Sequence, residues 1–192
     1  MNLLRTQPLA EFTTPADAFA ELASGFVGCA GLALDAAVVA AEDVPEPYRT
    51  LLVHEKHMTL TLTAHYNAFL ELQVKEMHYE GTLYSRKITL TAPRPVGESP
   101  VVEFGLIRLD LKYVPQPVWQ EIFQQRTPMG ELLLRHNILQ RIQPKWFLKF
   151  EPDSAVLKWM GCKTDKPLYG RLGTIYCNGD PAVEVLEVVT GV

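Results

Sequence analysis

The stretch that decides the fold is Gly173-Thr174-Ile175-Tyr176-Cys177-Asn178-Gly179-Asp180-Pro181-Ala182-Val183-Glu184-Val185-Leu186-Glu187-Val188-Val189, in which two apolar runs flank an Asn-Gly pair. Asn-Gly between two such runs is the strongest short-range signal for a β-hairpin, because both residues accept the positive φ of a tight two-residue turn. We therefore predict antiparallel strands at 173–177 and 182–189.

Further strands are expected upstream of this hairpin. Alternating or apolar runs bounded by turn residues predict extended segments at 67–78, 83–92, 101–111 and 138–150. Together with the hairpin they predict an antiparallel β-sheet of about six strands.

Residue spacing that is typical of helices occurs only in short segments. Start signals and periodicity predict helices that begin near Thr14, Tyr48, His57, Pro117 and Thr127. Strands and helices do not alternate regularly, so a parallel doubly wound sheet is disfavoured. We predict an α+β fold in which helices flank the sheet and cover one side of it.

The composition is that of an ordinary folded protein. The chain has 192 residues, 47% of them hydrophobic and 21% charged, with a net charge of −4. This excludes a disordered chain and gives no basic surface for a nucleic acid. We expect a single domain over 1–192, made of an Ala-rich N-terminal helical segment at 1–44 and a core at 45–192.

Cysteine usage indicates a reducing compartment. The three cysteines, Cys29, Cys162 and Cys177, form no CxxC pair and are odd in number, so we expect no disulfide scaffold and a cytoplasmic protein. The apolar stretch 19–41 contains Glu21 and Asp35, which makes it too polar for a signal peptide or a membrane span. We expect no membrane association.

Common catalytic motifs are missing from the sequence. His54 and His57 are spaced i, i+3 rather than as HExxH, so we expect histidines on a solvated helix face and no metal site. Neither GxSxG nor a glycine-rich phosphate loop occurs.

Two charged residues stand within otherwise apolar strands. By alternation, Arg86 shares a strand face with Tyr84 and Ile88. Glu187 shares a face with valines, but the opposite face carries Glu184, so periodicity does not decide which glutamate points inward. A buried charge is costly unless it is paired or used. From periodicity alone, exposure to solvent or a structural ion pair is the favoured interpretation.

Thr127-Pro128-Met129-Gly130 has the pattern of a helix start. Thr127 fits the N-cap and Pro128 the first helical position, which leaves the amides of Met129 and Gly130 at a positive helix end. Such amides suit a carboxylate. Ordinary helix capping is the favoured interpretation of this motif taken alone.

Taken in order, several short motifs resemble the chorismate lyase family. They are His57-Met58-Thr59, Arg86-Lys87-Ile88-Thr89-Leu90, Val102-Glu103-Phe104, Thr127-Pro128-Met129-Gly130, and Gly179-Asp180-Pro181 followed by a strand that ends in Glu187. The resemblance covers about residues 50 to 190, and its weight lies in the shared order and spacing.

The resemblance implies a carbon–oxygen lyase, chorismate pyruvate-lyase, which converts chorismate to 4-hydroxybenzoate and pyruvate without a cofactor. It implies an enclosed pocket and a place in ubiquinone or related aromatic biosynthesis. Arg86 would hold the ring carboxylate, Glu187 would lie near the ring hydroxyl, and Met58 and Met129 would contribute backbone contacts. We expect a monomer or weak dimer.

The alternative is a non-catalytic binding protein for an aromatic carboxylic acid. The same fold serves as an effector-binding module in some transcription regulators. No helix-turn-helix precedes the domain here and the chain is acidic, which disfavours a stand-alone regulator. Turnover of chorismate distinguishes the two hypotheses.

Overall fold

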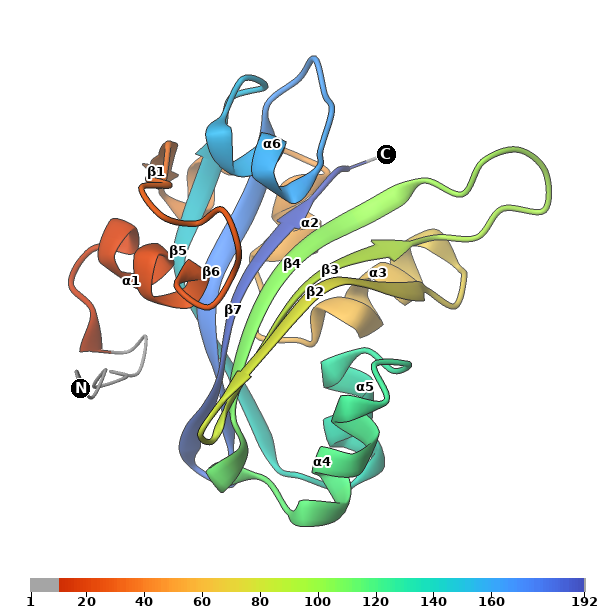
Figure 1. The fold of residues 1–192 in the computed structure, drawn as a ribbon. Coiled ribbons are helices and arrows are strands. Elements are labelled where there is room, and N and C mark those ends of the chain that lie inside the picture. The colour runs from red at the N-terminus through yellow and green to blue at the C-terminus, as the bar shows by residue number, and fades with distance from the viewer. Residues whose placement is uncertain (1–10, 192) are drawn as a thin grey trace.

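A single seven-stranded antiparallel sheet dominates the computed structural model, which describes residues 11–191 (Figure 1). The strand order is β1-β5-β6-β7-β4-β3-β2. The strands are β1 (Ala36–Val39), β2 (Glu71–Glu80), β3 (Leu83–Thr91), β4 (Val101–Asp110), β5 (Gln140–Phe150), β6 (Leu168–Cys177) and β7 (Asp180–Val189). The predicted α+β class and the antiparallel sheet are confirmed.

The predicted C-terminal hairpin lies inside the sheet. Asn178 and Gly179 adopt positive φ values of 53° and 99°, as a tight turn between β6 and β7 requires. Both strands begin earlier than predicted, and β7 also pairs with β4, so the hairpin joins the two halves of the sheet.

Residues 11–191 contain seven strands rather than about six, because β1 lies in the stretch where we predict helix. It pairs with β5 at one edge of the sheet. Its four residues are too few to show a period, so the Ala-rich composition around them dominates the sequence signal. Residues 1–10 of the predicted segment 1–44 lie outside the described residues.

The helices lie on both faces of the sheet, so the expectation of helices on one side is wrong. Figure 1 shows α4 and α5 on one side of the curved sheet and α1 on the other. The helices are α1 (Pro15–Ala23), α2 (Tyr48–Leu52), α3 (Met58–Tyr66), α4 (Gln116–Phe123), α5 (Met129–Arg135) and α6 (Ala155–Met160), with short 3₁₀ turns at Ala41–Asp43 and Leu111–Tyr113.

Two of the predicted helix starts are resolved in detail. Thr14 caps α1 as predicted, because its hydroxyl accepts a hydrogen bond from the Asp17 amide at 3.2 Å. Thr127 does not cap α5. Pro128 occupies the cap position without a side-chain bond, and the helix begins at Met129.

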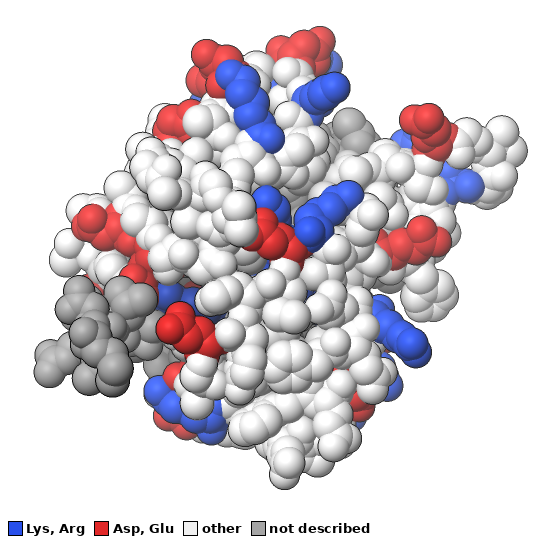
Figure 2. All heavy atoms as spheres, in the orientation of Figure 1, with Lys and Arg blue, Asp and Glu red and all other residues white. Residues whose placement is uncertain are grey.

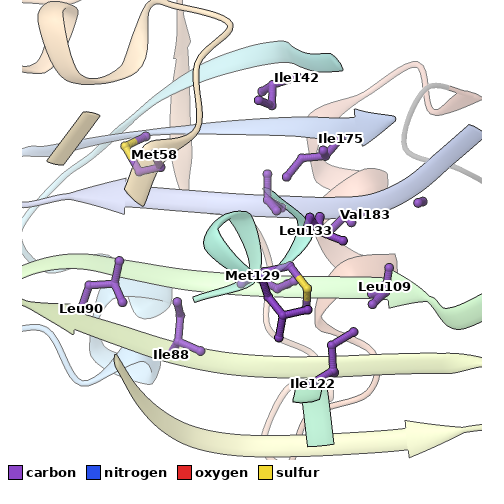
Figure 3. Close-up of a cluster of buried hydrophobic side chains, with 14 of the residues drawn as sticks. Met58, Ile88, Leu90, Leu109, Ile122, Met129, Leu133, Ile142, Ile175 and Val183 are labelled. Atoms are coloured by element: carbon purple, nitrogen blue, oxygen red, sulfur yellow. The ribbon is translucent and has the colours of Figure 1, made fainter. Parts of the chain in front are cut away.

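The two faces of the sheet carry separate hydrophobic cores. One core packs α2, α3, α4 and α5 against one face, and Figure 3 shows part of it, with Met58, Ile88 and Met129 among the labelled side chains. The other core packs Phe19 and Leu22 of α1 and Val156 of α6 against the opposite face. The central strands β4 and β7 are therefore buried on both sides.

The surface has no single sign of charge on the face drawn in Figure 2. Acidic and basic side chains are interspersed there, and a broad area in the lower half is free of charged residues. Within residues 11–191, no helix is both long and apolar enough to cross a membrane.

Candidate functional site

A small cavity lies between the sheet and the N-terminal ends of α3 and α5. Its volume is about 30 Å³, which leaves room for one or two water molecules. Strands β3, β4, β5, β6 and β7 form its floor. The wall consists of His57, Met58, Thr59, Ile88, Leu90, Glu103, Ile107, Pro128, Met129, Gly130, Ile142, Arg171, Ile175, Val185 and Glu187.

Three of the four predicted site residues meet at this cavity. Met58 is the first residue of α3, Met129 is the first residue of α5, and Glu187 lies on β7. Figure 3 shows the two methionine side chains, each at the start of its helix, close to the strands of the sheet. The cavity thus lies where the first residues of α3 and α5 face the same part of the sheet.

Arg86 lies on the same face of the sheet but is not part of the cavity wall. Its Nη1 and Nη2 donate long hydrogen bonds of 3.4 Å and 3.5 Å to the Thr127 carbonyl, and its Nε has no hydrogen-bond partner in the described part of the chain. The side chain is nevertheless fully buried. It is a buried guanidinium with weak hydrogen bonding, held beside the loop that precedes α5.

Glu187 pairs with Arg171, a residue that our sequence analysis missed. Arg171 Nε donates to Glu187 Oε2 at 2.6 Å, and Arg171 is only 1% exposed. Its Nη1 also donates to the carbonyls of Leu52 and His54, at 3.0 Å and 2.8 Å. Arg171 therefore joins β6 both to β7 and to the loop between α2 and α3. A predicted strand that began at Leu168 would have exposed this signal, because Arg171 then alternates onto the face of Gly173 and Ile175.

Glu103 on β4 is the second residue whose role the sequence did not indicate. It is 3% exposed, lines the cavity, and its Oε2 has no hydrogen-bond partner within residues 11–191. Burial raises the pKa of Glu103 well above its ordinary value, and the neighbouring Glu187 carboxylate adds to this, while Arg171 and Arg86 oppose it. Burial therefore favours the neutral acid of Glu103 to higher pH than in an exposed glutamate.

The two histidines before α3 differ from the prediction of a solvated helix face. His57 is 8% exposed and packs against α5, so closely that a Cβ on Gly130 would lie 2.8 Å from His57 Nδ1. Burial lowers the pKa values of both His54 and His57. Among residues 11–191 no group of His, Cys, Asp and Glu side chains is arranged to hold a metal ion.

The geometry also separates Glu187 from Glu184. Glu184 lies on the opposite face of β7, where Arg108 Nε donates to its Oε2 at 2.6 Å. Arg108 also donates to Glu21 of α1 at 2.6 Å. Both glutamates are buried in ion pairs, on opposite faces, and Glu187 is the one that faces the cavity.

The comparisons with known proteins give structural neighbours only. No family model matches the sequence. No curated protein matches it. The structure of PhnF from Mycobacterium smegmatis aligns with a TM-score of 0.52 at 13% identity, over 72% of this chain and 65% of that one, so the chain spans less than two thirds of that protein.

The effector domain of PhnF by itself gives a TM-score of 0.50 at 12% identity, over 70% of this chain and 88% of the domain. The possible transcriptional regulator YydK from Bacillus subtilis aligns with a TM-score of 0.41 at 8% identity, over 63% of this chain and 58% of that one. At such identities the likeness to PhnF shows a shared fold.

These neighbours correct the predicted activity. The prediction of a carbon–oxygen lyase is wrong, because the fold is shared with PhnF and with the effector domain of PhnF. The chain has the chorismate lyase-like fold in the form that PhnF uses as its effector domain.

Proposed function

We propose that this protein is a non-catalytic binding module that takes up a small organic acid in the cavity between the sheet and helices α3 and α5. One observation carries the proposal. The cavity wall holds the buried ionisable side chains Glu103, Arg171 and Glu187, and one oxygen of Glu103 has no partner in the described part of the chain. A buried polar atom without a partner is costly, and a ligand that supplies the missing hydrogen bond recovers that cost.

The ligand that fits this chemistry best is an aromatic carboxylic acid. The wall is otherwise apolar, with branched side chains such as Ile88, Ile142 and Ile175 that suit the flat faces of a ring. Arg86 nearby makes long hydrogen bonds to the Thr127 carbonyl and lies beside the Tyr84 hydroxyl, and it can exchange the long bonds for a bidentate contact with a carboxylate. We assign the ligand contacts to Arg86, Glu187, Met58 and Met129, without a cofactor.

Binding requires the cavity to expand. Its volume of about 30 Å³ is far below the ~150 Å³ of a cavity that accepts benzene. The covering elements are α3 and α5, which meet where His57 packs on Gly130. Separation of these two helix starts would enlarge the cavity without breaking strand pairs of the sheet.

Calorimetric titration with 4-hydroxybenzoate and with benzoate tests this function. We expect saturable binding, a rise in melting temperature that follows ligand concentration, and no release of pyruvate when chorismate is supplied. Arg86→Met should weaken binding at least about tenfold, since a charged hydrogen bond contributes about 1.5–3 kcal/mol.

Arg141→Met is the matched control, because Arg141 is an exposed arginine on β5 and should leave affinity unchanged. The proposal fails if neither acid binds saturably, or if Arg86→Met binds as tightly as the unmodified protein.

A further inference from the structure

We propose that Glu103 contacts the ligand as a neutral acid, so that the cavity takes up a singly charged anion only while Glu103 carries a proton. This inference rests on the proposed function, because it concerns the same cavity. In this proposal, Glu103 determines which charge a ligand must carry to bind in the cavity.

The position of Glu103 gives it access to the ligand. On β4 it lies opposite Leu90 of β3 and Val189 of β7, and two residues further along the same face Gly105 lies opposite Glu187. A Cβ on Gly105 would lie 2.9 Å from Ile88 Cγ1 and 3.7 Å from Glu103 Oε1, so Ile88 packs over this glycine and the Glu103 side chain turns along its strand beside it. Glu103 and Glu187 both line the cavity, and their two carboxyl groups therefore approach the same space.

The charged groups around Glu103 leave one positive charge without a partner once Glu103 is protonated. They are Arg86 on β3, Arg171 on β6 and Glu187 on β7. Glu187 neutralises Arg171 through their 2.6 Å hydrogen bond, which leaves Arg86. An ionised Glu103 would cancel that charge, and the cavity would then have no net attraction for an anion.

The residues at the starts of α3 and α5 do not change the net charge around Glu103. His57 lines the cavity from the start of α3, and burial lowers its pKa, which favours the neutral ring. The described wall residues from α5, Met129 and Gly130, are not titratable. Burial favours the protonated form of Glu103 as well, since its pKa is raised. A neutral carboxylic acid donates an O–H, and the acceptor it needs is an oxygen of the ligand.

The experiment compares three probes that share one ring: benzoate, the neutral benzamide, and phenylphosphonate, which is doubly charged at about pH 8. We expect benzoate to bind at least about tenfold more tightly than the other two. Its Kd should be constant at low pH and rise about tenfold per pH unit once Glu103 ionises in the free protein.

Two variants assign that pH dependence to Glu103. Glu103→Gln keeps the shape and stays neutral, so its Kd for benzoate should not change with pH. Glu184→Gln alters the buried glutamate on the opposite face and should follow the unmodified protein. Equal affinity for benzamide or phenylphosphonate, or the same pH dependence in Glu103→Gln, would overturn the assignment while leaving the binding function intact. Absence of saturable binding by all three probes would instead reject the binding function and the assignment with it.

Discussion

The Arg171 guanidinium holds together three parts of the chain that are distant in sequence. It donates to Glu187 on β7 and to carbonyls of the loop that leads into α3. A guanidinium offers five donors in a fixed plane, so a single buried arginine can bind acceptors from several segments at once. Arg171 therefore fixes the position of the loop over the cavity, including His57.

Replacement of Arg171 should be strongly destabilising. Arg171→Met leaves Glu187 buried without its partner, so the free energy of unfolding in urea should fall by about 3–5 kcal/mol at neutral pH. Arg141→Met, on the neighbouring strand β5, removes an exposed arginine that stacks on Tyr176 and should cost less than about 1 kcal/mol. A similar small loss in both variants would show that the Arg171 pair contributes no more than a surface contact.

The raised pKa of Glu103 predicts how stability changes with pH. The unfolded chain releases this proton near the ordinary pKa of about 4.5, whereas the folded protein keeps it to higher pH. Between these two values the unfolded state binds fewer protons, so the free energy of unfolding falls as pH rises, by up to about 1.4 kcal/mol per unit.

Urea unfolding at a series of pH values measures this slope. Glu103→Gln cannot release a proton and should gain stability relative to the unmodified protein as pH rises above about 4.5. Glu98→Gln, an exposed glutamate in the loop between β3 and β4, should behave as the unmodified protein does. Parallel pH profiles for all three proteins would contradict a buried neutral acid at position 103.

For single residues, the sequence identified charged side chains within apolar strands but not the residues with which they pair. Periodicity singled out Glu187 and Glu184 as charges within an apolar strand, but β7 is buried on both faces, so alternation could not place either one. It did not predict that Arg171 rather than Arg86 pairs with Glu187. That pairing depends on the sheet order, which brings β6 beside β7 and places β4 between β7 and β3.

Among the elements, the pairing of β6 with β7 requires a residue without a side chain at one point. A Cβ on Gly170 would lie 2.6 Å from the Glu187 carbonyl oxygen, which is backbone and cannot rotate away. The close approach of the two strands at this glycine also sets where the Glu187 and Arg171 side chains lie, since Arg171 is directly opposite Glu187.

Gly170→Ala should therefore destabilise the protein by about 1–3 kcal/mol or more, because the strands must move apart. Ligand affinity should fall as well, since Glu187 is displaced. Gly25→Ala is a suitable control, because its Cβ would meet only the side chain of the exposed His78, at 3.2 Å. Thermal melting and benzoate titration of both variants measure these effects, and an unchanged melting temperature in Gly170→Ala would refute the steric argument.

The elements that the sequence predicted are those with local signals. Asn178-Gly179 predicts its hairpin because the turn itself requires these residues, and Thr14-Pro15 predicts the start of α1 for the same reason. By contrast, β1 consists of four small apolar residues whose extended form depends on pairing with β5. Strand β1 forms because it pairs with β5, and no pattern within its own four residues could predict it.

For the whole molecule, burial on both faces of the sheet makes the N-terminal segment part of the fold. Phe19 and Leu22 of α1 are fully buried against the face of the sheet opposite the cavity. Arg108 of β4 also bonds to Glu21 of α1, which ties the helix to the central strands. We therefore propose that 1–192 form a single domain and that the segment 1–44 is not an independent appendage to the core 45–192.

This proposal predicts one cooperative unfolding transition. Phe19→Ala should lower the free energy of unfolding by about 3–5 kcal/mol, because it leaves a cavity in the second core. Val27→Ala, in the same segment but at a residue 83% exposed, should have little effect. If the chain is one domain, tryptophan fluorescence and far-ultraviolet circular dichroism should report the same midpoint in both variants, and both probes should shift together in Phe19→Ala. A loss of helical signal that precedes the fluorescence change would mean instead that α1 unfolds from a core that remains folded without it, and the effect of Phe19 would then be local.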